Sequence, residues 1–66
     1  MVTNVWKIVD HPKDYPNDFV ARKFVDGKAT DVFVASWCLE EVQWMLGKMG
    51  LLKADREEPG VKEIYE

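Results

Sequence analysis

The side chains best suited to nucleophilic catalysis are Cys38, the only cysteine, and His11, the only histidine. A thiolate–imidazole pair works only when the two groups come within hydrogen-bond reach of each other. Here the pair would have to join a proline-containing loop to the core face of a predicted helix, so we expect Cys38 to pack as a small hydrophobe. The sequence therefore predicts no catalytic residue and no enzymatic activity.

Three aspartates, Asp10, Asp14 and Asp18, recur every four residues and offer the oxygen ligands that hard cations prefer. Two prolines interrupt any helix that would align them, and the alternating aspartates of a calcium loop are missing. Residues 26–28, Asp-Gly-Lys, are too short for a phosphate-binding loop and suit a turn. We therefore predict no metal site and no cofactor.

The length of 66 residues limits what the chain can build. Folding of so small a chain buries only about 60% of the surface that the unfolded state exposes, so a deep cleft would remove needed packing. We expect a single domain over residues 1–66. The lone cysteine excludes an intrachain disulfide and favours the reducing cytoplasm. We see neither a leader peptide nor a membrane span, and we expect no export and no membrane insertion.

The charge distribution argues against direct binding to nucleic acid or to an anionic membrane. The formal net charge is −3, whereas both partners prefer a basic surface. Acids and bases cancel in residues 1–35, so the deficit lies in residues 36–66. The acidic side chains there are Glu40, Glu41, Asp55, Glu57, Glu58, Glu63 and Glu66. They form either a solvated face or a DNA-like surface that fits a basic groove. Four basic residues interspersed among them weaken the likeness to DNA.

The elements that position these residues follow from the hydrophobic pattern. Strands are predicted at residues 2–9, 19–25, 30–35 and 61–65, a loop at 11–18, a positive-φ hairpin turn at 26–27 and another turn at 57–60. Residues 51–54 form either a short strand or a docking segment. A helix is predicted over residues 37–49, with Ser36 as N-cap and Gly50 as a left-handed C′ residue.

This order, β-β-β-α-β, predicts an α+β fold, with an antiparallel sheet of three to five strands and one α-helix packed on one face. The core side of the helix is expected to hold Cys38, Leu39, Val42, Met45, Leu46 and Met49. Trp37 and Trp44 fall among polar residues on its other side. Either the loop or the C-terminal segment covers these two rings, or they are presented to a partner, since tryptophan is enriched at binding hot spots.

The predicted strands are apolar on both faces, as Val5 and Val9 against Trp6 and Ile8 illustrate. One helix covers one face only. The second face is either closed by the tail as the sheet curls, or it is the interface of a homodimer, or it docks on a larger partner.

Several segments resemble short bacterial and prophage-type proteins of uncharacterised function. They are residues 10–16 (DHPKDYP), 19–22 (FVAR), 39–42 (LEEV) and 59–65 (PGVKEIY). These segments carry structural signals and imply no activity. In size, acidity and lack of catalytic motifs the chain also resembles the class of phage anti-CRISPR inhibitors, which bind a defence complex and block it. No motif is shared with that class, so no residue role is implied.

We therefore expect a non-enzymatic acidic binding protein, an inhibitor from a phage or mobile element. Its partner would be a larger protein, such as the basic nucleic-acid-binding surface of a defence complex. The residues expected to bind that partner are Trp37, Trp44, Glu40, Glu41, Asp55, Glu57, Glu58 and Glu63. The alternative is a small structural homodimer, paired through the open sheet face, or an adaptor without an inhibitory role.

Overall fold

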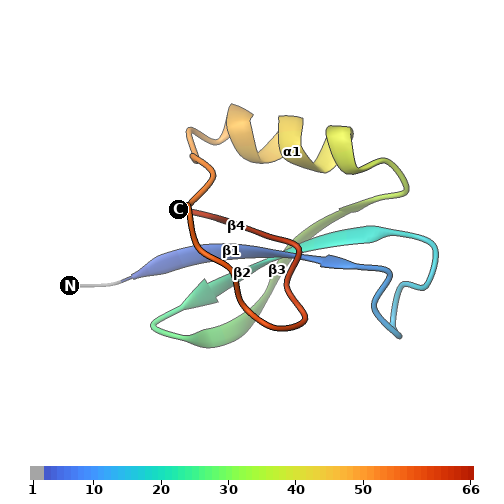
Figure 1. The fold of residues 1–66 in the computed structure, drawn as a ribbon, viewed down its shortest axis with the longest axis horizontal. Coiled ribbons are helices and arrows are strands. Elements are labelled where there is room, and N and C mark those ends of the chain that lie inside the picture. Colours follow the sequence, from blue (N-terminus) through green and yellow to red (C-terminus); the bar gives the residue numbers. More distant parts are fainter. Residues whose placement is uncertain (1–2) are drawn as a thin grey trace.

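A computed structural model describes residues 3–66 and contains an antiparallel sheet with one helix across one of its faces (Figure 1). The elements are β1 (Asn4–Asp10), β2 (Phe19–Val25), β3 (Lys28–Ser36), α1 (Leu39–Lys48) and β4 (Glu63–Tyr65). The four strands lie in the order β3-β2-β1-β4, and each neighbouring pair is antiparallel. The predicted α+β fold, with its β-β-β-α-β order, is confirmed. Residue 2, predicted to begin the first strand, lies outside the described residues.

The turn between β2 and β3 is made by two residues, Asp26 and Gly27. Their φ angles are 51° and 82°, the left-handed values that a type I′ hairpin requires at both central positions. Val25 and Lys28 pair directly across this turn. The predicted turn is confirmed, and β3 begins two residues earlier than expected because so tight a turn brings its flanking residues into register.

The start of the helix differs from the expectation. Ser36 was predicted to be the N-cap, but it pairs with Phe19 as the last residue of β3, and this pairing keeps the chain extended. Cys38 is the N-cap, with φ −110° and ψ 120°, and its carbonyl accepts the N–H of Val42 at 3.3 Å. Ser36 Oγ instead accepts the N–H of Cys38 at 3.2 Å. Trp37 therefore lies in the link before α1 and not within it.

The helix ends as its glycine predicts. Gly50 has φ +82°, and its N–H donates to the carbonyl of Gly47 at 3.0 Å. The N–H of Leu51 donates to the carbonyl of Leu46 at 3.2 Å, which completes a Schellman motif. Met49 is the C-cap, so α1 stops one residue earlier than expected.

The core lies between α1 and the sheet face beneath it. Its buried members are Trp6, Ile8, Ala21, Val42, Leu46 and Tyr65, with Phe19, Val34, Leu39, Met45 and Leu51 packed against them. Two residues expected on the core side of the helix flank α1 instead. Met49 follows its last turn and is 48% exposed, and Cys38 precedes its first turn and is half-buried.

Residues 51–54 run beside β4 and extend the sheet. Leu52 and Glu66 exchange two backbone hydrogen bonds of 3.0 and 2.9 Å, and the N–H of Ala54 donates to the carbonyl of Ile64 at 2.7 Å. The turn predicted at residues 57–60 is confirmed, because Glu58 and Val61 pair across it. The last strand is shorter than expected and begins at Glu63.

The sheet face away from α1 is covered by two segments of the chain itself. The loop at residues 11–18 reaches over it, since the Tyr15 ring lies 5.4 Å from that of Phe33. The segment before β4 also lies on the side opposite the helix (Figure 1). Val20 and Ile64 on this face are 3% and 1% exposed. Much of the apolar surface on this second sheet face is therefore buried by the chain itself.

Candidate functional site

The outer side of α1 presents one of two exposed tryptophans. Trp44 is two positions from Val42 and two from Leu46, so it points about 160° away from both of these buried residues. Its side chain is 62% exposed, and Trp37, just before the helix, is 78% exposed. Neither the loop at residues 11–18 nor the C-terminal segment covers the two rings.

Two carboxylates lie one helical turn before Trp44. Glu40 and Glu41 are exposed in the first turn of α1, where the positive end of the helix dipole favours negative charge. They are four and three residues before Trp44, which makes them its neighbours on the helix surface. Within residues 3–66, no nitrogen of a basic side chain lies within 4.0 Å of either carboxylate. We name Trp37, Glu40, Glu41, Trp44 and Lys48 the outer helix surface.

The ring of Trp44 already receives a cation from its own helix. Lys48 Nζ lies 5.0 Å from the ring centroid, within the range of a cation–π contact. Gly47, on the same side, leaves the neighbouring surface bare, since a Cβ there would meet nothing within 4 Å. An aromatic face beside free carboxylates is a chemical arrangement that recognises lysine or arginine side chains.

The other predicted partner-binding acids do not join this surface. Glu58 pairs with Lys7 at 3.1 Å. Lys7 lies on the sheet face away from α1, because its neighbours Trp6 and Ile8 both point into the core beneath the helix. Glu58 therefore lies on the opposite side of the sheet from Glu40.

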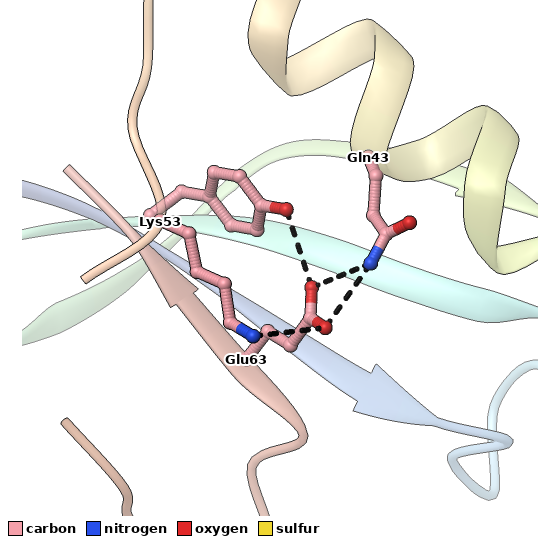
Figure 2. Close-up of polar contacts among 4 residues, drawn as sticks. Gln43, Lys53 and Glu63 are labelled. Atoms are coloured by element: carbon pink, nitrogen blue, oxygen red, sulfur yellow. Dashed lines mark hydrogen bonds and ion pairs between the residues drawn. The ribbon is translucent and has the colours of Figure 1, made fainter. Parts of the chain in front are cut away.

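Glu63 is part of an internal polar cluster with Gln43, Lys53 and Tyr65 (Figure 2). Its side chain is only 12% exposed, and it accepts hydrogen bonds from Gln43 Nε2 at 2.9 Å and the Tyr65 hydroxyl at 3.2 Å. Lys53 Nζ lies 3.6 Å from its second oxygen. Burial raises the pKa of Tyr65 above 10.0, and the charge and hydrogen bond of Glu63 raise it further. This carboxylate joins α1, β4 and residues 51–54.

The remaining acids lie along the C-terminal segment. Asp55 and Glu57 are exposed in the loop before β4, and Glu66 pairs with Arg56 at 2.7 Å. The acidic half of the chain is thus divided among the helix, the loop and the far side of the sheet. These acids therefore do not all lie on one face of the domain.

The residues considered for catalysis lie in structural positions. The His11 ring contacts that of Phe19 at 5.0 Å and pairs with the Asp10 carboxylate, while Cys38 caps α1. Among residues 3–66, no group of three or more His, Cys, Asp or Glu side chains is placed to hold a metal ion. Nor does this part of the chain contain a helix long and apolar enough to cross a bilayer.

A hollow on the sheet face away from α1 was not predicted from the sequence. It has a volume of about 180 Å³ and is lined by Val9, Pro12, Asp14, Tyr15, Val20, Arg22 and Phe24. The sequence did contain a signal for it. Side chains alternate between the two faces of β2, so Arg22 shares a face with two apolar residues, Val20 and Phe24.

No family model, curated protein or solved structure matches this chain.

Proposed function

We propose that this chain is a non-enzymatic binding protein whose outer helix surface docks on a basic region of a larger protein. The observation that carries the proposal is the exposure of Trp37 and Trp44, 78% and 62%, in a chain this small. A chain of 66 residues needs its large apolar side chains for the core, and two indole rings left in water contribute little to the stability of the fold.

Charge supports a basic partner. Glu40 and Glu41 are exposed one helical turn before Trp44, and an ammonium group, that of Lys48, lies 5.0 Å from the centre of the Trp44 ring. A lysine or arginine of the partner would displace Lys48 from the ring. It would then make both a cation–π contact with Trp44 and an ion pair with a carboxylate. Tryptophan at the centre and charge at the rim is the usual anatomy of a protein interface.

The biological consequence would be occupancy of the partner's site. If that site normally binds nucleic acid, occupancy makes the chain an inhibitor of the anti-CRISPR type that its size and acidity resemble. If the partner keeps its activity, the chain is an adaptor. An activity assay of the partner with and without the chain separates the two roles.

The proposal is tested by affinity capture from host lysate with the wild-type chain and matched variants. We expect a partner to be retained by the wild type, lost with Trp44→Ala and with Glu40→Lys/Glu41→Lys, and kept by Glu57→Lys. Glu57 is a suitable control because it is exposed on the C-terminal loop, away from α1. Capture of nothing, or of a protein that the Trp44→Ala chain retains equally, would contradict the proposal.

Self-association is the alternative, and light scattering tests it. We expect a monomer at high micromolar concentration, because the loop at residues 11–18 and the segment before β4 cover much of the sheet face that a homodimer would use. A stable dimer that persists in the Trp44→Ala variant would favour the sheet-face homodimer instead.

A further inference from the structure

The hollow on the sheet face away from α1 has the size of one aromatic ring. Strands β1 and β2 form its floor through Val9, Val20 and Phe24, and the loop at residues 11–18 forms a wall through Pro12 and Tyr15. Its volume of about 180 Å³ is close to the roughly 150 Å³ that accommodates benzene in an apolar cavity. It is well below the 300 Å³ or so at which pockets for drug-sized ligands begin.

One cation lies among these apolar residues. Arg22 is half-buried, its guanidinium carbon lies 5.1 Å from the centre of the Phe33 ring, and Nη1 donates to the carbonyl of Thr30 at 2.9 Å. In the part of the chain that the structure describes, no carboxylate oxygen lies within 4.0 Å of this guanidinium. The Phe33 ring and the Thr30 carbonyl stabilise this charge, and the remaining N–H groups of the guanidinium can donate to an external anion.

Lys7, the neighbouring cation on the same face, differs from Arg22 because it has an anionic partner. Lys7 is directly opposite Arg22 in the register of β1 and β2. Its ammonium lies 4.5 Å from the Phe24 ring and 3.1 Å from a carboxylate oxygen of Glu58. Lys7 therefore has an anionic partner within the chain, whereas the N–H groups of Arg22 that do not bind Thr30 can donate to a carboxylate beside the hollow.

Asp14 also lines the hollow and defines how a ligand would lie in it. Its carboxylate is exposed on the loop and is more than 4.0 Å from the Arg22 guanidinium. An anionic group is repelled by Asp14 and attracted by Arg22, so it must sit beside Arg22 and away from Asp14. The apolar part then occupies the space among Val9, Val20 and Phe24.

We propose that this hollow binds a small aromatic carboxylate, with its ring against β1 and β2 and its carboxylate on Arg22. The site is on the opposite side of the sheet from the outer helix surface. It is independent of the partner proposed above, so each proposal stands or fails separately.

The test is a titration of the ¹⁵N-labelled chain with phenylacetate, followed by amide chemical shifts. We expect saturable shifts centred on Val9, Val20 and Phe24, with an affinity of about millimolar, because the loss of translational and rotational freedom offsets most of what so small a ligand gains. Phenethylamine has the same ring with the opposite charge and should bind at least about tenfold more weakly, since a charge-assisted hydrogen bond is lost. No saturable shift, or equal binding of the amine, would overturn the assignment.

Variants assign the role of Arg22. Arg22→Gln should weaken phenylacetate binding about tenfold by removing that charge-assisted bond. Lys23→Gln is the matched control, because Lys23 is the next residue of β2 and pairs in register with Trp6, whose side chain points toward α1. Asp14→Asn, in an exposed loop position, should tighten binding and does not depend on the fold tolerating a change at Arg22. Equal effects of Arg22→Gln and Lys23→Gln, or weaker binding by Asp14→Asn, would contradict the proposal.

Discussion

Gln43 on α1 donates its side-chain amide to Glu63 on β4, with Nε2 at 2.9 Å from one carboxylate oxygen and 3.1 Å from the other. The Tyr65 hydroxyl donates to the same carboxylate at 3.2 Å. Because the Glu63 side chain is 12% exposed, these donors replace most of the water that a free carboxylate would bind. The pair therefore fixes the helix to the edge of the sheet.

We predict that Gln43→Ala lowers the free energy of unfolding by about 1–3 kcal/mol, because it leaves a largely buried carboxylate with fewer donors. Unfolding in urea, followed by circular dichroism, measures the change. A double-mutant cycle with Glu63→Ala should give a coupling energy of at least about 0.5 kcal/mol.

Lys53→Gln serves as the comparison for this cluster. Lys53 is 61% exposed and its ion pair with Glu63 spans 3.6 Å, so its loss should cost less than about 1 kcal/mol. If Lys53→Gln destabilised the chain more than Gln43→Ala, the ion pair and not the amide would hold the helix to β4.

The pKa of Tyr65 predicts a loss of stability at alkaline pH. Burial, and then Glu63, favour the neutral phenol and raise its pKa above 10.0 in the folded state. The unfolded chain then releases this proton at a lower pH than the folded chain, so the stabilisation is complete below about pH 10 and falls as pH rises through the folded pKa. Urea midpoints of wild type and Tyr65→Phe, measured across this range, isolate the effect from the lysines. Parallel losses in the two proteins would contradict it.

Local signals in the sequence were sufficient for most of the fold. Asp26 and Gly27 predicted the hairpin because few residue pairs tolerate two positive φ angles. Gly50 predicted the end of α1 for the same reason. The start of α1 was not predictable from capping preference, because the pairing of Ser36 with Phe19 is a contact between residues far apart in sequence.

The candidate site was predictable where it depends on helix periodicity and not where it depends on long-range contacts. The spacing of Trp44 from Val42 and Leu46 places its ring outside the core. Glu63 was counted with the surface acids because nothing local shows that α1 brings Gln43 over it. The hollow beside Arg22 was missed because it exists only once the loop at residues 11–18 folds over β2.

Two glycines three residues apart should respond oppositely to alanine. Gly47 lies inside α1 in open surroundings, so Gly47→Ala should stabilise the chain by about 1 kcal/mol through helix propensity. Gly50 has φ +82°, and Gly50→Ala should cost about 1 kcal/mol because an alanine there is strained. Urea unfolding of both variants measures the difference. A gain from Gly50→Ala would show that the Schellman motif does not form in solution.

The outer helix surface predicts that two large residues on one helix differ sharply in their contribution to stability. Leu46 is fully buried, and Leu46→Ala should cost about 2–5 kcal/mol, which comes close to unfolding so small a domain. Trp44→Ala should change the free energy of unfolding by no more than about 0.5 kcal/mol, because the side chain is 62% exposed and alanine is the better helix former. Thermal unfolding of the two variants measures both effects. A cost for Trp44→Ala close to that for Leu46→Ala would mean that the indole packs on the fold in solution, and its role in binding a partner would then lose its support.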